Sequence, residues 1–250
     1  MLTNEYSLIV LGYILAAYVI CGIVKGSIGF GLPTVSISLL AFLIDVKIII
    51  ALILLPTLIV NIYQLSRGGN FKKIIVETKF FLFCSTIFIY PGAFLLKKFD
   101  SQIIIFFIAL ILLINSIFFL TDIKFKIPNS DKPVIQILIG SINGIIIGMT
   151  SIYTMPLIFL LQSLNYNKNT TIQFLGIAFF LYPLAQLFAF TNFDLISINI
   201  IKDSILITLP IFLGFLIGKK IRDLISEKLF QKMFYLMLLF MSCIILINLI

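Results

Sequence analysis

The chain has 250 residues, of which 61% are hydrophobic and only 11% charged, and its mean hydropathy is +1.21. Soluble domains carry charge on about a quarter of their residues, so this composition excludes an ordinary soluble protein and predicts a polytopic membrane protein. The formal net charge is +8, but the 18 basic residues are scattered singly or in pairs. This scatter fits loop charges beside lipid headgroups and disfavours a nucleic-acid-binding surface.

The first apolar stretch, from about residue 6 to residue 43, is too long for one crossing at ~1.5 Å per residue. Between Gly22 and Thr34 it holds four glycines and a proline, a composition that disfavours a regular helix. Inside a bilayer, irregular backbone persists only where protein or a water-filled cavity satisfies its polar groups. We therefore expect a helix break here, and the break is a candidate functional site.

The remaining apolar stretches predict further spans on both sides of a hydrophilic linker at residues 121–133. The expected spans lie near residues 48–65, 80–96 and 103–120, then, after a second long stretch at 134–164, near 171–190, 204–218 and 229–250. The predicted fold is an all-α polytopic membrane protein of about eight transmembrane helices in two four-helix repeats, each with a broken first helix. Repeat 1 covers residues 6–120 and repeat 2 covers 134–250, within a single membrane transporter domain.

A single shift of 122 residues relates the two halves and indicates an internal duplication. The shift superimposes residues that chance matching between apolar segments does not explain: Gly22 on Gly144, Gly26 on Gly148, Gln64 on Gln186, Gly92 on Gly214, and Lys97 and Lys98 on Lys219 and Lys220.

The ten acidic residues all fall at expected span ends or in loops, so no carboxylate is expected in mid-membrane for a proton or sodium relay. The sequence contains no histidine, and Cys21, Cys84 and Cys243 lie in separate apolar stretches. We therefore expect no disulfide, no metal, no cofactor and no enzymatic activity.

Lys25 is the one charge that cannot easily be placed at a membrane edge. A buried cation costs several kcal/mol unless it is paired or hydrated. An anionic ligand is one natural partner, and the alternative is that Lys25 snorkels to an interface.

The two predicted breaks suit anion binding, because exposed amides at the start of a half-helix, beside hydroxyl groups, bind anions without a formal charge. The small-xxx-small spacing of their glycines also suits close helix packing. Asn61, Gln64, Gln173 and Gln186 are candidate ligands for an oxyanion or links between helices. The expected substrate site, shared by both breaks, comprises Lys25, Gly26, Ser27, Gly29, Gly31, Pro33, Thr34, Gln64, Gly148, Thr150, Ser151, Tyr153, Pro156 and Gln186.

These stretches resemble the TauE/SafE family of sulfite exporter-like membrane permeases. The resemblance rests on two four-span halves, each opening with a glycine-rich stretch that ends in a proline, here Lys25 to Pro33 and Gly144 to Pro156. In the second stretch Thr150, Ser151 and Tyr153 largely replace the glycines of the family's pattern. The resemblance implies export or uptake of a small sulfur-containing or organic anion, such as sulfite, a sulfonate or sulfoacetate.

The expected protein is thus a multi-pass permease of the plasma membrane (bacterial inner membrane type), with a small anion and the lipid bilayer as partners and no nucleic acid. Two alternatives remain. One is a channel-like anion pathway, which would use the same residues, and the other is a non-transporting scaffold or assembly protein of another membrane complex, which would not need Lys25.

Overall fold

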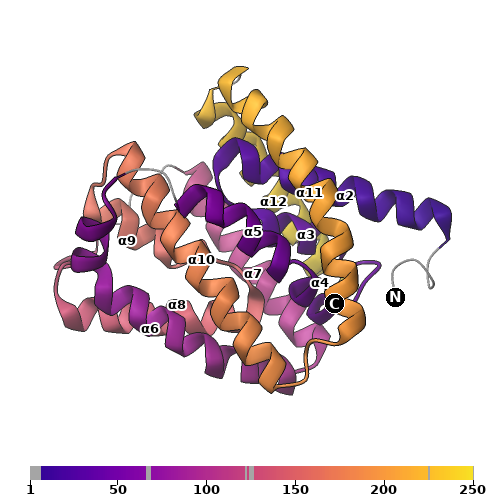
Figure 1. Ribbon diagram of the computed structural model, residues 1–250, viewed down its shortest axis with the longest axis horizontal. Helices are drawn as coiled ribbons and strands as arrows, with labels where there is room; N and C mark the ends of the chain where they lie inside the picture. Colours follow the sequence, from indigo (N-terminus) through magenta and orange to yellow (C-terminus); the bar gives the residue numbers. More distant parts are fainter. Residues whose placement is uncertain (1–6, 66–68, 122, 124–126, 225, 250) are drawn as a thin grey trace. The chain divides into compact units, whose positions relative to one another are not determined.

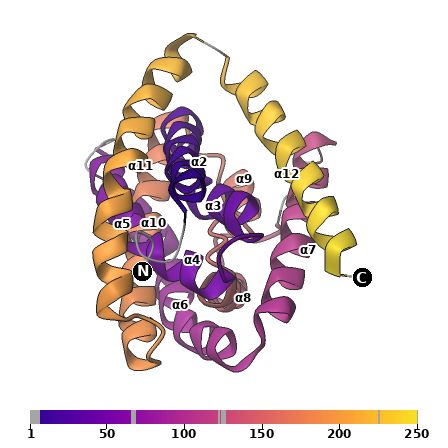
Figure 2. The same cartoon turned by 90° about the vertical axis from the view of Figure 1, so that its right-hand side faces the viewer.

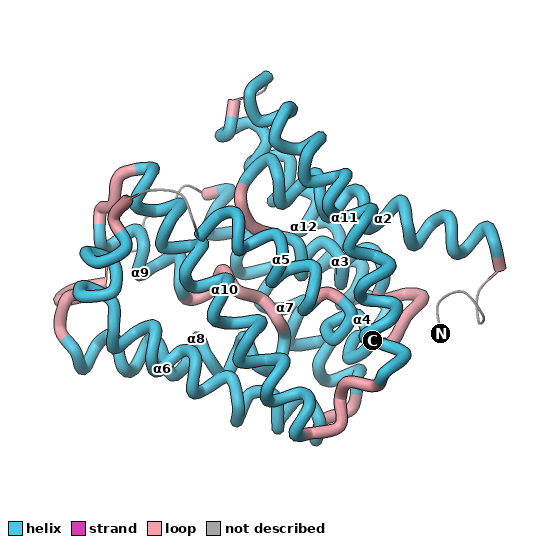
Figure 3. The backbone as a smooth tube through the Cα atoms, in the orientation of Figure 1, coloured by secondary structure: helices cyan, strands magenta, loops and turns pink. Residues whose placement is uncertain are grey.

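The computed structural model describes residues 7–65, 69–121, 123, 127–224 and 226–249, and within them every regular element is a helix (Figures 1 and 3). The helices are α2 (Leu8–Ile28), α3 (Leu32–Leu40), α4 (Val46–Leu52), α5 (Leu54–Leu65), α6 (Phe71–Lys98), α7 (Ser101–Leu120), α8 (Pro133–Thr150), α9 (Leu157–Leu164), α10 (Lys168–Asn192), α11 (Ile198–Leu224) and α12 (Glu227–Leu249). This confirms the predicted all-α fold. Among the described residues, α2, α6, α7, α8, α10, α11 and α12 are long and apolar enough to cross a membrane.

One expected span is not a single long helix: the span near residues 48–65 is divided into α4 and α5 at Ile53. Pro56 explains the division, since it has no N–H to donate to the carbonyl of Leu52 and its ring clashes with that carbonyl. The hydroxyl of Ser204 on α11 donates to the freed Leu52 carbonyl at 2.5 Å. The count of eight spans and the two-repeat arrangement remain predictions.

Two helices begin earlier than the apolar pattern predicted. α6 starts at Phe71, before the expected span at 80–96, so Lys72 and Lys73 lie within the helix, and α11 starts at Ile198, before the expected span at 204–218. As a result Asp203, expected outside a span, lies in the second turn of α11 and is buried. Apolar composition marks the lipid-facing part of a helix, whereas the helix continues until its backbone hydrogen bonds end.

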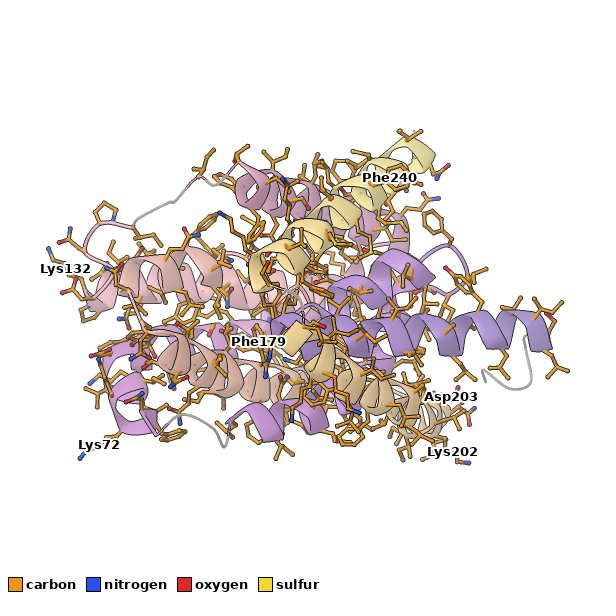
Figure 4. All side chains as sticks on the ribbon, turned by 90° about the horizontal axis from the view of Figure 1, so that it is seen from above. Lys72, Lys132, Phe179, Lys202, Asp203 and Phe240 are labelled. Atoms are coloured by element: carbon orange, nitrogen blue, oxygen red, sulfur yellow. The ribbon has the colours of Figure 1, made fainter. Side chains whose placement is uncertain are left out.

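The chain forms two compact units, each assembled from both halves of the sequence. Unit 1 comprises Met1–Pro56, Ser101–Asp122 and Asp194–Ile250, and unit 2 comprises Thr57–Asp100 and Ile123–Phe193. In unit 1, α2 packs on α11 and α7 packs on α12 (Figure 2). In unit 2, α6 packs on both α8 and α10 (Figure 1). Figure 4 shows Lys72 and Lys132 at one end of unit 2, well separated from each other.

Glycines allow the main helix pair of each unit to approach backbone to backbone. In unit 1, a Cβ on Gly22 would lie 2.1 Å from the Ile211 carbonyl oxygen, and one on Gly214 would lie 2.1 Å from that of Val19. In unit 2, a Cβ on Gly148 would lie 2.2 Å from the carbonyl oxygen of Ile89. Such distances leave no room for any other residue, so the small-xxx-small packing expected from the sequence is present in both units.

This packing corrects one expectation about the first break. Gly22 and Gly26 do not interrupt the helix, because α2 runs regularly to Ile28. Their close contact with α11 outweighs the low helix propensity of glycine. The interruption is confined to residues 29–31, and Pro33 lies in the first turn of α3, where proline is compatible with a helix.

Candidate functional site

The break in unit 1 is made by two glycines in the left-handed conformation. Gly29 caps α2 with φ 85°, and Gly31 precedes α3 with φ 93°. Residues other than glycine rarely adopt these backbone angles. At Gly31 a Cβ would in addition lie 3.0 Å from the ring of Phe234. The sequence therefore encodes a sharp, tightly covered turn, after which α3 runs back along α2: the Ser36 hydroxyl lies 3.2 Å from the Cys21 sulfur, and the Tyr13 hydroxyl donates to the Leu39 carbonyl at 2.9 Å.

Lys25 is held at this turn. Its Nζ donates to the Gly29 carbonyl oxygen at 2.7 Å, and only 2% of its surface is exposed. The ammonium thus stays at the break and does not extend to an outer surface, contrary to the snorkelling alternative. A cation in the last turn also complements the negative end of the α2 dipole.

The start of α3 presents backbone donors at the same turn. Its N-cap, Gly31, provides no side-chain hydrogen bond to the first-turn amides. Thr34, in that first turn, is buried. A helix N-terminus carries a partial positive charge, so this end of α3 and the Lys25 ammonium both favour a negative charge at the break.

Two predicted site residues of unit 1 also fasten α2 to α11. The Ser27 hydroxyl lies within hydrogen-bonding distance of two carbonyl oxygens, at 2.8 Å from that of Ile23 and 3.0 Å from that of Gly218. Gly26 faces the Phe215 carbonyl, where a Cβ would approach to 2.3 Å. Both residues therefore position the break against its neighbouring helix.

The break in unit 2 has the same local geometry without glycine. Ser151 caps α8 with φ 55°, and its N–H donates to the Ile147 carbonyl, as the Gly29 N–H donates to that of Lys25. The Thr150 hydroxyl donates to the Ile146 carbonyl and accepts from the Ile152 N–H. α9 then begins after Pro156, again with no side-chain cap.

Gln186 on α10 connects the groups of this second break. Its amide nitrogen donates to the Ser151 hydroxyl at 2.7 Å and to the Ile147 carbonyl at 3.0 Å. Its amide oxygen accepts from the Tyr153 hydroxyl at 2.8 Å. Three predicted site residues are therefore brought together, and the carboxamide of Gln186 is occupied by the protein itself.

The other polar candidates have protein partners or cannot be described. Asn61 donates to the Phe179 carbonyl at 2.7 Å, the group that Pro183 leaves without its helical donor. Gln173 accepts from the backbone N–H of Asn70. Both act as links between helices. The side chain of Gln64 lies outside the described residues.

Sequence reasoning missed a second buried polar group in unit 2, which we call the Asn143 cluster. It consists of Asn143 on α8, Tyr182 on α10 and Ser85 on α6, all fully buried. The Asn143 amide nitrogen and the Ser85 hydroxyl lie 3.1 Å and 3.3 Å from the Tyr182 hydroxyl. The one available signal was an amide next to Gly144 in an otherwise apolar run.

The two breaks belong to different units, so each stands by itself and the expected shared site remains a prediction. The comparisons with known proteins gave one match. The family model described as "Sulfite exporter TauE/SafE" matches residues 14–245. No curated protein and no solved structure matches the chain.

Proposed function

The chain belongs to the sulfite exporter TauE/SafE family, and from this membership we propose that it carries a small sulfur-containing or organic oxyanion across the plasma membrane. The family resemblance expected from the glycine-rich stretches is confirmed. The family consists of membrane transporters, which fits the expectation that this chain is not an enzyme.

The observation that supports anion transport most strongly is the arrangement at the unit 1 break. The Lys25 ammonium, held at Gly29, and the uncapped start of α3 place one full and one partial positive charge at the same turn. Both charges favour a negatively charged ligand at this turn. We propose that the transported anion neutralises it, with Thr34 and the first-turn amides of α3 as donors.

The unit 2 break contributes in a different way. Ser151, Tyr153 and Gln186 bond to one another and to backbone. We propose that they hold the shape of this break, while Lys25 in unit 1 supplies the charge. This division follows from the replacement of glycines by hydroxyl residues in the second glycine-rich stretch.

Uptake by proteoliposomes tests this proposal. Purified protein is reconstituted, and the entry of ³⁵S-labelled sulfite and thiosulfate is followed against protein-free liposomes. A carrier gives uptake that saturates with concentration and is inhibited by unlabelled anion. Uptake that rises without saturation indicates the channel-like pathway. Uptake equal to that of protein-free liposomes contradicts transport of these anions and favours the scaffold alternative.

A further inference from the structure

The Asn143 cluster contains a buried acceptor that the protein does not satisfy. Asn143 donates through its amide nitrogen to Tyr182, but its amide oxygen is buried with no hydrogen-bond partner. Few buried polar groups in folded proteins lack a partner, because leaving one unpaired forfeits its interactions with water. The carboxamide of Asn143 is therefore a position where a partner from outside the protein is expected.

The proton inventory of the cluster indicates what kind of partner fits. A tyrosine hydroxyl has one proton, and the Tyr182 oxygen has both the Asn143 amide and the Ser85 hydroxyl as neighbours. Rotating the Asn143 carboxamide by 180° exchanges its two ends. Tyr182 then donates to the amide oxygen, and the amide nitrogen with its two N–H groups takes the position at which the amide oxygen has no hydrogen-bond partner. An oxyanion is a ligand that accepts from such a group.

The position of the cluster relates it to the second break. Asn143 lies on α8 two helical turns before Ser151. The ring of Tyr182 lies edge-on to that of Tyr153, with centroids 5.7 Å apart. Tyr153 belongs to the break through its bond to Gln186. A ligand at Asn143 would therefore adjoin the residues that shape the break.

Gln186 provides a contrast to Asn143. Both are fully buried carboxamides in unit 2. Gln186 has three bonds to Tyr153, Ser151 and Ile147, with its oxygen and its nitrogen both engaged. Asn143 has one. The same functional group thus serves as a structural link in one position and retains binding capacity in the other.

We propose that Asn143 is a substrate-binding residue, whose amide nitrogen donates to an oxygen of the transported anion while the Tyr182 hydroxyl holds its amide oxygen. This inference rests on the proposed function and adds to it a second, uncharged binding position in unit 2. Because that position offers hydrogen bonds without a charge, it discriminates among anions by the placement of their oxygens.

Anion titration of the purified full chain tests the inference. Isothermal titration with thiosulfate and with sulfite compares the wild type with Asn143→Leu, which removes the donor, and Asn143→Asp, which introduces an acidic oxygen of similar size. The matched control is Asn115→Leu, a change of another buried asparagine, on α7. We expect both Asn143 variants to weaken binding about tenfold or more, as the loss of a hydrogen bond to a charged group does, and the control to bind like the wild type.

The titration results distinguish the inference about Asn143 from the proposed function. Wild-type affinity in Asn143→Leu and Asn143→Asp, with binding intact in the parent, overturns the inference and leaves the proposed function standing. Failure of the wild type to bind either anion overturns both. If Asn143→Leu alone does not fold, the double variant Asn143→Leu/Tyr182→Phe removes both ends of the hydrogen bond and is titrated in its place, with the same tenfold loss expected.

Discussion

At the scale of single residues, two charged groups of the protein differ in their surroundings. Lys25 is fixed at a break by a short bond to Gly29. Tyr166, outside the long helices, is by contrast half-buried and donates to the Glu77 carboxylate at 2.7 Å, with the Lys73 ammonium 5.9 Å from its ring centre. We propose that the first arrangement holds the charge of a ligand, whereas the second stabilises the connection before α10.

Tyr166 carries a pH-dependent prediction. Burial, together with its bond to the Glu77 carboxylate, raises the pKa of Tyr166 above its ordinary value of 10.0. The unfolded chain therefore releases the Tyr166 proton at a lower pH than the folded chain does, and the contribution of Tyr166 to stability, complete below pH 10, declines as pH rises further. Thermal unfolding should show a difference between wild type and Tyr166→Phe that is constant below that pH and shrinks above it. A difference that grows with pH would contradict this assignment.

The sequence predicted some residues of the candidate site and not others. Lys25, Ser151 and Gln186 could be proposed from the sequence because a charge, a hydroxyl or an amide is conspicuous in an apolar stretch. Asn143 was missed because its importance depends on a missing partner, and only the packing of α6, α8 and α10 shows which polar groups are paired. Gly26 was assigned to binding, although its contact with α11 already accounts for a glycine there.

At the scale of helices, two carbonyls released by prolines are satisfied from sequence-distant helices. Pro56 leaves the carbonyl of Leu52 without its helical donor, and Ser204 donates to it. Pro183 likewise leaves the carbonyl of Phe179 without its helical donor, and the Asn61 amide nitrogen donates to that carbonyl. In a bilayer an unsatisfied carbonyl costs several kcal/mol. The kinked helices thus depend on these two side chains.

A double-mutant cycle tests this dependence. Ser204→Ala should lower the free energy of unfolding by about 1–2 kcal/mol in the wild type. In a Pro56→Ala background the restored N–H of residue 56 can serve the Leu52 carbonyl, so the same change should cost clearly less. Unfolding by sodium dodecyl sulfate in mixed micelles measures all four proteins. Equal costs in the two backgrounds would show that Ser204 acts independently of the proline.

The glycine contacts of α2 give a second prediction at this scale. Gly22→Ala places a methyl group 2.1 Å from the backbone of α11 and should destabilise the protein by at least about 2 kcal/mol. Gly12 lies on the same helix, and a Cβ there meets nothing within 4 Å. Gly12→Ala should therefore leave stability unchanged or raise it by up to about 1 kcal/mol. The same micelle unfolding compares the pair, and similar effects at both positions would refute the packing account.

Helix positions followed from composition better than helix ends did. The long apolar stretches located every membrane-length helix, because hydrophobic length is a direct requirement of the bilayer. The regular course of α2 through Gly22 and Gly26 did not follow, since it depends on α11, almost two hundred residues later. The division at Ile53 did not follow from apolar length either, since it depends on Pro56.

At the scale of the whole chain, helices of one sequence half pack on helices of the other half. The first helix of each half packs on a helix of the other half: α2 on α11, and α8 on α6. A local sequence pattern cannot show this packing between halves, because both helix pairs join elements that are far apart in the chain. Movement of one half as a body against the other would pull apart both glycine-packed pairs, so we expect each pair to move as one body during transport.

Cross-linking between α6 and α10 tests the related expectation that the two halves do not separate within unit 2. The Asn70 amide nitrogen lies 3.0 Å from the Thr170 hydroxyl, and the two residues come from different halves. In a background with Cys21, Cys84 and Cys243 replaced by alanine, Asn70→Cys/Thr170→Cys should oxidise to a disulfide and still take up thiosulfate in proteoliposomes. Loss of uptake on oxidation, restored by reduction, would show that the halves move apart at this point.

The account as a whole depends on an anion being held by the charge at the unit 1 break. Lys25→Gln and Lys72→Gln remove the same charge, one from the break and one from an exposed position at the end of unit 2 (Figure 4). Isothermal titration of both variants with thiosulfate should show affinity reduced about tenfold or more in Lys25→Gln and unchanged in Lys72→Gln. Wild-type affinity in Lys25→Gln would contradict the central claim.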